Sequence, residues 1–279
     1  MKTQPITPAI LPVGRIGLGC VTFGREIDEA ASFTLLDHAL DRGVRHFDTA
    51  AAYGGGASET ILGKWLASRR PEGITVATKI LPPYDSIDIT PSLKRLGVDQ
   101  IDLLYLHQWH ETAPQADAML EGLPVKLFGA SNVTLDQLRG LGPRFRVIQN
   151  NHNLAVSDVT DALRDYCAAN EIAIVTYSPL GAGFLTGKHQ NGVQPGSRFE
   201  IIPGHQQIYF NDSANHRLAR LEAVARRSGH SQAHLALAWA LHQPRIETVL
   251  IGGRTPAHLD QAFAALDFAD EVLLGDLAT

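Results

Sequence analysis

Three short apolar segments of this sequence each end on an ionisable residue, and this pattern strongly limits the folds open to the chain. The segments are Val44–Asp48, Ile74–Lys79 and Ile101–His107. Their last residues are spaced by roughly 30 positions, which is the length of one strand-helix-strand unit. Because parallel strands all end at the same face of a sheet, we expect Asp48, Lys79 and His107 to converge there.

A tyrosine is expected to join this cluster. Tyr53 comes shortly after Asp48 and precedes Gly54–Gly56, so it should lie on a loop that a rigid sheet holds in place. A lysine at the end of a buried strand needs a counter-charge, and Asp48 is the obvious partner of Lys79. Each residue taken alone has an ordinary structural explanation, but together with His107 at consecutive strand ends they indicate a shared site.

Strand and helix patterns alternate through the chain. The predicted strands are Arg15–Cys20, Val44–Asp48, Ile74–Lys79, Ile101–His107, Val125–Ala130, Phe145–Gln149, Ile172–Tyr177 and Thr248–Ile251. The predicted helices are Asp28–Asp41, Ser58–Leu66, Pro91–Leu96, Pro114–Glu121, Leu135–Gly140, Asp158–Asn170, Asn215–Ser228 and Ser231–His242. A length of 279 residues with 44% hydrophobic content suits one barrel. We therefore predict an α/β fold, an (α/β)8 TIM barrel, with residues 1–279 as a single domain.

The segment Ser178–Ala214, after the seventh predicted strand, breaks this alternation. It is rich in Gly and Pro, and it shows neither strand nor helix periodicity. Unstructured segments of this length inside compact domains are usually lids or binding loops. We expect a long loop that covers the face on which Asp48 and Lys79 lie.

Charge and hydropathy exclude some partners. The net charge of −5 lacks the basic field that nucleic acids or anionic membranes attract. Prolines interrupt the segment Met1–Pro8, where a signal peptide needs an apolar run, and no run reaches the roughly 18 apolar residues of a membrane span. We expect a cytoplasmic protein with neither a membrane nor a nucleic acid as partner.

The residues that could bind a metal are too few. Cys20 and Cys167 are far apart and have no Cys or His neighbours at metal-binding spacing. His107 and His110 are three positions apart and Glu111 is adjacent, but they do not form a His-Glu-x-x-His motif and no further ligand lies at a sensible distance. We expect no metal site and no disulfide.

Five motifs, in order from about Gly17 to Leu266, resemble the aldo-keto reductase family. They are Phe47–Gly54 with Ser58-Glu59, Lys79 after a short strand, Leu104–Trp109, Gly129–Asn132 and Tyr177–Lys188. The resemblance implies an NAD(P)H-dependent oxidoreductase that reduces an aldehyde or ketone to the alcohol by hydride transfer. Two alternatives remain open: an NAD(P)+-dependent sugar (aldose) dehydrogenase, and a weakly active nicotinamide-binding regulatory subunit.

The resemblance gives the four clustered residues catalytic roles that their chemistry supports. Tyr53 would be the proton donor, but a free phenol has a pKa near 10. We expect Lys79 to lower that pKa and Asp48 to hold Lys79 in place. His107 would orient the substrate oxygen, where charge develops during hydride transfer.

The resemblance also implies residues that bind the coenzyme at strand ends and in the loops that follow them. They are Gly19, Cys20, Val21, Asp48, Ser131, Asn132, Gln149, Tyr177, Ser178, Leu180, Gly181, Gly183, Gly253, Arg254, His258 and Gln261. Within this set, Ser131, Asn132 and Gln149 match positions that bind the nicotinamide carboxamide, and Tyr177 matches the aromatic residue that stacks on the ring. The residues from Ser178 to Gly183 resemble the segment that wraps the pyrophosphate.

The choice between NADPH/NADP+ and NADH/NAD+ depends on the loop after the last strand. Arg254 could pair with a 2′-phosphate, which favours NADP(H). However, His258 stands where the family commonly has Arg, and Ala262 stands where an Asn usually meets the adenine. NAD(H) therefore remains possible.

Substrate contacts are expected from aromatic and catalytic residues around the same face. They are Phe23, Tyr53, His107, Trp109 and Tyr209. The alternative for Phe23, Trp109 and Tyr209 is that they only pack the long loop against the barrel. The sequence identifies neither the natural carbonyl or sugar substrate nor the oligomeric state.

Overall fold

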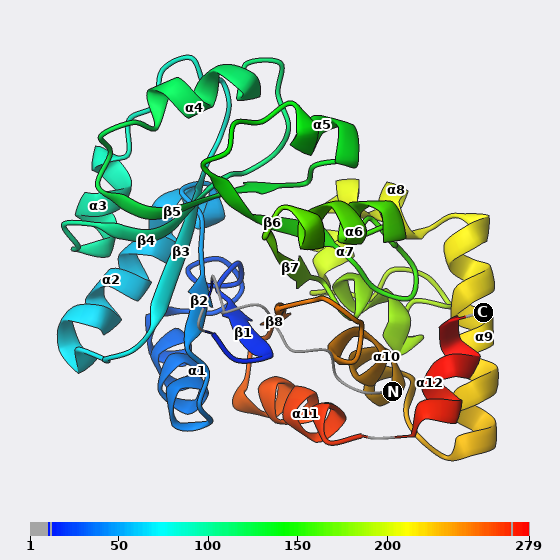
Figure 1. Ribbon diagram of the computed structural model, residues 1–279. Coiled ribbons are helices and arrows are strands. Elements are labelled where there is room, and N and C mark those ends of the chain that lie inside the picture. Colours follow the sequence, from blue (N-terminus) through cyan, green and yellow to red (C-terminus); the bar gives the residue numbers. More distant parts are fainter. Residues whose placement is uncertain (1–10, 12, 269, 279) are drawn as a thin grey trace.

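Eight parallel strands form a closed barrel in the order of the chain, and β8 pairs with β1 (Figure 1). The computed structural model describes Leu11 and residues 13–268 and 270–278. The strands are β1 (Ile16–Gly19), β2 (His46–Asp48), β3 (Thr75–Ile80), β4 (Ile101–Leu106), β5 (Val125–Ser131), β6 (Phe145–Asn151), β7 (Ala173–Tyr177) and β8 (Thr248–Gly252). The predicted (α/β)8 TIM barrel is confirmed.

The helices surround the barrel (Figure 1). They are α1 (Glu29–Asp41), α2 (Ala57–Arg69), α3 (Thr90–Leu96), α4 (Ala116–Met119), α5 (Leu135–Arg139), α6 (Asp161–Ala169), α9 (Asp212–Ser228), α10 (Gln232–Leu241), α11 (Pro256–Leu266) and α12 (Glu271–Ala278). The prediction had no helix after β8, so α11 and α12 were missed. Helices α4 and α5 have only 4 and 5 residues, whereas α1 has 13.

Side-chain caps set where several helices begin. Asp28 accepts a hydrogen bond from the backbone N–H of Ala31 at the start of α1. Thr160 accepts one from Leu163 N, so α6 begins at residue 161 rather than at the predicted Asp158. Such caps satisfy backbone N–H groups that have no partner in the first turn of a helix. The capping residues therefore locate the helix starts more accurately than hydrophobic periodicity does.

The expectation of an unstructured loop over Ser178–Ala214 is wrong. This segment contains η3 (Gly181–Thr186), α7 (Arg198–Ile201), η4 (Pro203–His205), α8 (Gln206–Tyr209) and the start of α9. Neighbouring rings in the segment have centroids 4.9 to 6.3 Å apart and form an aromatic cluster of Phe184, His189, Phe199, Tyr209 and Phe210. The segment builds a small core of its own because it buries these rings.

Two apolar layers support the barrel. The larger lies between the sheet and the helices, and the smaller fills the barrel interior. The interior layer consists of Leu11, Ala77, Leu103, Tyr105, Val147, Val175 and Leu250. Asp48, Lys79 and Gln149 are also buried, and they are polar side chains of the strands. The barrel interior is a packed core, as in other barrels of this type.

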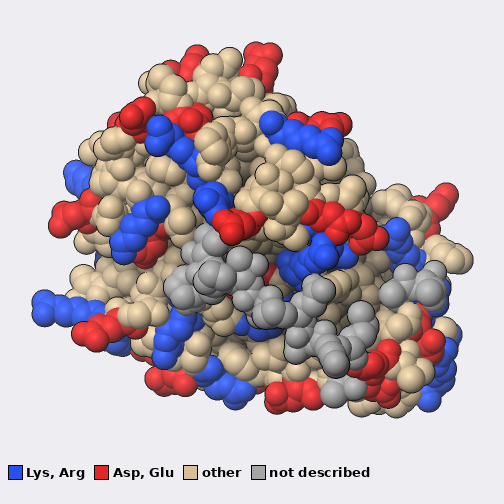
Figure 2. All heavy atoms as spheres, in the orientation of Figure 1, with Lys and Arg blue, Asp and Glu red and all other residues tan. Residues whose placement is uncertain are grey.

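Charges of both signs are interspersed on the face of the molecule seen in Figure 2. Among the helices of the described residues, none combines the length and apolar character that a membrane span requires. The segment Met1–Pro8, from which we judged a signal peptide absent, lies outside the described residues.

The packing of α2 against α3 predicts a stability effect. A Cβ at Gly63 would lie 2.2 Å from Arg95 O and 2.8 Å from Leu96 O, which are backbone atoms of α3. We expect Gly63→Ala to destabilise the fold by about 2 kcal/mol or more, because backbone cannot move away as easily as a side chain.

Gly275→Ala in α12 is the matched control, since a Cβ there meets nothing within 4 Å. Alanine at an open helical position should stabilise by about 0.5–1 kcal/mol. The free energy of unfolding in urea measures both variants, and equal effects would contradict the close approach of α2 and α3.

Candidate active site

Four side chains meet at the carboxyl end of the barrel, and they come from three neighbouring strands. The Lys79 ammonium donates hydrogen bonds to Asp48 Oδ1, to Thr49 O at 2.8 Å and to the Tyr53 hydroxyl at 3.2 Å. The rings of Tyr53 and His107 meet edge to face with centroids 5.6 Å apart. The structure therefore brings together the four residues that the spacing of strand ends indicated.

Lys79 and Asp48 form a buried ion pair. The exposed fractions of their side chains are 1% and 3%. Burial lowers the pKa of Lys79, but the Asp48 carboxylate and the Tyr53 hydroxyl raise it, and the net pKa lies above its ordinary value. Lys79 is therefore a cation at neutral pH.

We expected Lys79 to lower the pKa of Tyr53 below its ordinary value. Lys79 does act in that direction, but the expectation is wrong for the resulting pKa. Burial raises the pKa of the phenol, and the opposing effect of the Lys79 charge is smaller. The pKa of Tyr53 therefore lies above its ordinary value. Because desolvation disfavours the phenolate, the hydroxyl stays protonated at neutral pH and can donate a proton.

His107 is an uncharged imidazole. Burial lowers its pKa to about 4, and the nearby Lys79 cation acts in the same direction. Its backbone N–H donates to Ile80 O at 2.9 Å, and its backbone O accepts from Asn132 Nδ2 at 2.9 Å. Its Nδ1 atom is buried and has no hydrogen-bond partner among the described residues. The two bonds fix the backbone of His107, and its neutral imidazole can donate a hydrogen bond that orients a carbonyl oxygen.

The residues expected to meet a nicotinamide carboxamide lie beside this cluster. Ser131 Oγ donates to Gln149 O at 2.8 Å, and Tyr177 Oη donates to Asn132 Oδ1 at 2.5 Å. Gln149 Nε2 donates to Asp48 Oδ2 at 2.7 Å. These residues lie at or near the ends of β5, β6 and β7, so neighbouring strands place them around one opening.

The backbone after β7 is tightly turned where a pyrophosphate is expected. Ser178 and Ala182 are not glycines, yet both have φ of 56°. Gly181 also has a positive φ, and a Cβ there would lie 2.9 Å from the Tyr209 ring. Residues other than glycine are strained in the left-handed backbone conformation, and such strain is concentrated at ligand-binding and catalytic sites. The half-buried Leu180 lies in the same turn, and Gly183 has φ of 97°.

The loop between β8 and α11 contacts the long segment. Arg254 donates through one guanidinium nitrogen to Gly196 O at 2.9 Å, and its backbone N–H donates to His258 Nδ1 at 3.2 Å. Gly253 O accepts from Thr22 Oγ1 at 2.9 Å. Gln261 is exposed on α11. The loop therefore links the start of α11 to the segment that precedes α7.

The remaining predicted coenzyme contacts lie at the end of β1. Gly19 and Cys20 are buried, and Val21 is half-buried. Cys20 N donates to Asp48 O at 2.8 Å, and Ser58 Oγ donates to Cys20 O at 2.8 Å. The Cys20 thiol is in the core, so only its backbone lies at the barrel mouth.

The expected substrate contacts are wrong for two of the aromatic residues, Phe23 and Tyr209. Phe23 is 0% exposed and Tyr209 is 2% exposed, so neither ring presents a face to a substrate. The Tyr209 hydroxyl accepts a hydrogen bond from Asn151 Nδ2 at 3.0 Å, which fixes α8 to the end of β6. These two residues pack loops against the barrel, which is the alternative that the sequence analysis left open for them. Trp109 is half-buried.

Two asparagines that the sequence analysis did not select organise this face. Asn151 binds the Tyr209 hydroxyl, and Asn153 Nδ2 donates to Ser178 O at 2.9 Å. Both belong to the polar run Gln149–Asn153, which directly follows the apolar residues of β6. Such a run at the end of a buried strand is itself a signal, because buried amides need partners.

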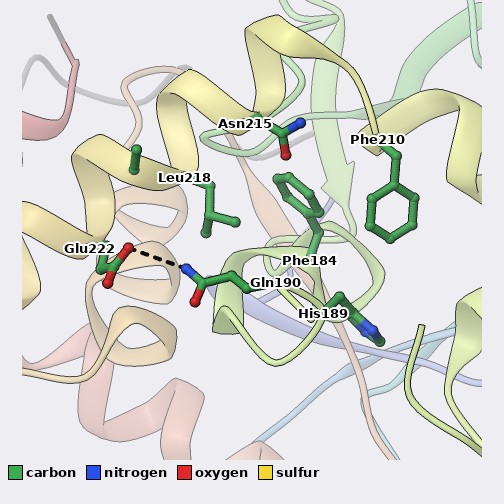
Figure 3. A pocket seen from close by; sticks show the side chains of 8 residues that line it. Phe184, His189, Gln190, Phe210, Asn215, Leu218 and Glu222 are labelled. Carbon is green, nitrogen blue, oxygen red and sulfur yellow. Dashed lines mark hydrogen bonds between the residues drawn. The ribbon is translucent and has the colours of Figure 1, made fainter. Parts of the chain in front are cut away.

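Two hollows in the described part of the chain differ in their relation to the four clustered residues. One of about 420 Å³ lies between the long segment and α9, and Gln190 reaches across it to Glu222 at 3.2 Å (Figure 3). Its lining contains none of the predicted site residues. The other, of about 260 Å³, is lined by Ala51, Ala52 and Ile80, which adjoin Tyr53 and Lys79 in sequence. Across the described part of the chain, no three His, Cys, Asp or Glu side chains are grouped closely enough for a metal ion.

Comparison with known proteins gives a consistent result. A sequence profile described as the Aldo/keto reductase family matches residues 15–272. The aldo-keto reductase YhdN of Bacillus subtilis is 30% identical over 93% of this chain and 87% of its own length.

Solved structures share the fold. A glycerol dehydrogenase of Gluconobacter oxydans superposes with a TM-score of 0.75 at 23% identity, covering 98% of this chain and 94% of its own. An aldo-keto reductase of Klebsiella pneumoniae, solved in complex with NADPH, has a TM-score of 0.72 at 20% identity, covering 94% and 89%.

The buried ion pair predicts a large stability effect. Asp48→Asn leaves the Lys79 cation buried without a counter-charge, and we expect a loss of about 3–5 kcal/mol in the free energy of unfolding. The double variant Asp48→Asn/Lys79→Met removes both charges and should recover most of that loss.

The exposed pair Lys64–Glu29, with side chains 56% and 47% exposed, is the control. Glu29→Gln should change stability by less than about 1 kcal/mol. Urea unfolding of all three variants tests this, and a double variant no more stable than Asp48→Asn would argue against a buried pair.

Proposed function

The chain belongs to the aldo/keto reductase family, and from that premise we propose that it reduces an aldehyde or ketone to the alcohol with a nicotinamide coenzyme. The observation that best supports this is the hydrogen bond from the Lys79 ammonium to the Tyr53 hydroxyl, 3.2 Å long, inside a buried ion pair. A protonated phenol beside a fixed cation can donate to an oxygen that gains negative charge.

The protonation states favour reduction at neutral pH. Tyr53 keeps its proton because burial raises its pKa, and His107 is neutral because burial lowers its pKa to about 4. A carbonyl oxygen near both side chains would accept a hydrogen bond from the phenol and be oriented by the imidazole. As the oxygen becomes an alkoxide, Tyr53 gives up its proton and the Lys79 cation stabilises the phenolate.

The residues around the barrel mouth fit a nicotinamide coenzyme, which supplies the hydride when bound. Asn132, Tyr177 and Ser131 would hold the nicotinamide end beside the four clustered residues. The strained turn from Ser178 to Gly183 would present its backbone to the pyrophosphate, because glycine permits close approach. The other predicted contacts, at Gly19 to Val21 and in the loop after β8, would complete this site.

NADPH is the proposed coenzyme. Arg254 lies in the loop just before α11; it is half-buried, and one of its guanidinium nitrogens donates to Gly196 O. A guanidinium can pair with a 2′-phosphate through two nitrogens. A fold relative from Klebsiella pneumoniae was solved with NADPH, which supports the same choice. NADH remains the alternative because His258 and Ala262 depart from the family pattern.

Simple measurements distinguish carbonyl reduction from the two alternative functions. A sugar dehydrogenase would run the same chemistry in reverse, and the raised pKa of Tyr53 would make that reaction faster as pH rises. Initial rates with NADPH and an aldehyde panel, compared with NAD+ and free sugars, distinguish the directions. A regulatory subunit would bind NADPH without multiple turnovers.

We further propose that residues 1–279 form one domain in the cytoplasm. The strands from residue 16 to residue 252 all belong to one barrel. Cys20 and Cys167 are free thiols, which suits a reducing compartment.

The proton-donor role predicts a selective loss. Tyr53→Phe should reduce kcat for carbonyl reduction by about 100-fold or more, because general acid catalysis contributes about 10²–10⁴. NADPH affinity, measured by quenching of protein fluorescence, should change less than about threefold. Tyr166→Phe, on α6, is the matched control, and retained turnover in Tyr53→Phe would remove this role.

The 2′-phosphate role of Arg254 makes a separate prediction. Arg254→Ala should weaken NADPH binding by about 1.5–3 kcal/mol, the contribution of a hydrogen bond to a charged group. NADH affinity in the same variant should stay near that of the unsubstituted protein, which controls for loosening of the contact with Gly196. Equal losses for both coenzymes would exclude Arg254 from phosphate recognition.

A further inference from the structure

The carboxylate of Asp48 has a second partner besides Lys79. Oδ1 accepts from the Lys79 ammonium, and Oδ2 accepts from Gln149 Nε2 at 2.7 Å. Asp48 and Gln149 are both 2% exposed. Asp48 ends β2 and Gln149 belongs to β6, which is not a neighbour of β2 in the barrel. The hydrogen bond therefore crosses the barrel interior.

We propose that Gln149 is a positioning residue, which orients the Asp48 carboxylate so that its other oxygen holds Lys79 against Tyr53. This inference rests on the proposed carbonyl reduction. It differs from the coenzyme contact that the family resemblance implies for Gln149. In the present arrangement one N–H of the amide nitrogen donates to Asp48, and the second N–H and the amide oxygen can still face another group.

The position of Gln149 is itself held by the end of β5. Its backbone O accepts from Ser131 Oγ at 2.8 Å and from Asn132 N at 3.0 Å. These two bonds fix the backbone from which the amide extends, so the donor is already in place before any substrate arrives. A donor held in advance needs no reorganisation when charge moves during a reaction.

The surroundings of Asp48 explain why this donor matters. The titratable groups that face the Asp48–Gln149 contact are Cys20 at the end of β1, His46 on β2, Tyr53 in η1 (Tyr53–Gly56), Lys79 on β3, Tyr105 on β4 and His107 after β4. Lys79 is the cation in this set, since burial lowers the pKa of both His46 and His107 to about 4. Without Gln149, Oδ2 would be a buried charged oxygen lacking its donor, which is unfavourable.

Two substitutions separate positioning from coenzyme binding. Gln149→Met removes the donor and roughly keeps the volume. Gln149→Glu restores a donor only when the new carboxyl group is protonated, because the ionised form repels Asp48. Asn151→Asp is the matched control, since it places an acid on the same strand, 5% exposed, where its amide faces the Tyr209 hydroxyl.

The experiment measures kcat, and NADPH affinity by fluorescence, from pH 5 to pH 9. We expect kcat of Gln149→Met to fall by about 10- to 100-fold at every pH, the equivalent of one hydrogen bond to a charged group. Gln149→Glu should show the same loss at high pH and recover activity as pH falls. NADPH affinity should change less than about threefold in both Gln149 variants.

One result would contradict the positioning role of Gln149. If both Gln149 variants bind NADPH at least tenfold more weakly while the pH profile of kcat is unchanged, Gln149 acts on the coenzyme and the inference is wrong. If the unsubstituted protein reduces no carbonyl compound, the proposed function fails, and the contact is then tested by thermal unfolding against pH.

In that measurement the two acid variants are compared. The Asp48 charge should raise the pKa of a glutamate at position 149 in the folded state, so its stabilising effect is present at low pH and is lost as pH rises through that raised value. The melting temperature of Gln149→Glu should therefore fall with pH over a higher range than that of Asn151→Asp. Identical pH dependence in both variants would show that position 149 does not sense Asp48.

Discussion

The buried ion pair between Lys79 and Asp48 is the interaction on which the rest of this structure depends. Two charges taken out of water are unfavourable unless each is closely paired and hydrogen-bonded. Here the ammonium also reaches Thr49 O and the Tyr53 hydroxyl, while the second carboxylate oxygen takes the Gln149 amide. The barrel makes this possible because it brings β2, β3 and β6 to one mouth above a layer of apolar side chains.

This pair also sets the protonation states around it. Lys79 is held as a cation, and its charge helps to keep the His107 imidazole neutral. Tyr53 lies against the same cation but remains a phenol because burial outweighs the attraction. An ammonium cation, a neutral imidazole and a protonated phenol that lie together can deliver a proton to a carbonyl oxygen that gains negative charge.

The long segment after β7 is joined to the carboxyl end of the barrel by hydrogen bonds. Its aromatic cluster gives it a core, and Asn151 and Asn153 tie it to the end of β6 through the Tyr209 hydroxyl and Ser178 O. Arg254 ties it to the loop before α11. These bonds connect the proposed pyrophosphate turn to rigid strands, so the proposed coenzyme site and the four clustered residues share one scaffold.

The sequence by itself determined the barrel and the identity of the clustered residues, because strand spacing decides which side chains end at the same face. The sequence did not predict the short helices of Ser178–Ala214, because they have no helical periodicity and are held by buried aromatic rings. Only the tertiary structure decided that Phe23 and Tyr209 are buried, that burial outweighs Lys79 at Tyr53, and that Gln149 bonds to Asp48. The physical reason is that burial and hydrogen-bond partners depend on residues from distant strands, whereas periodicity and spacing are properties of one stretch of chain.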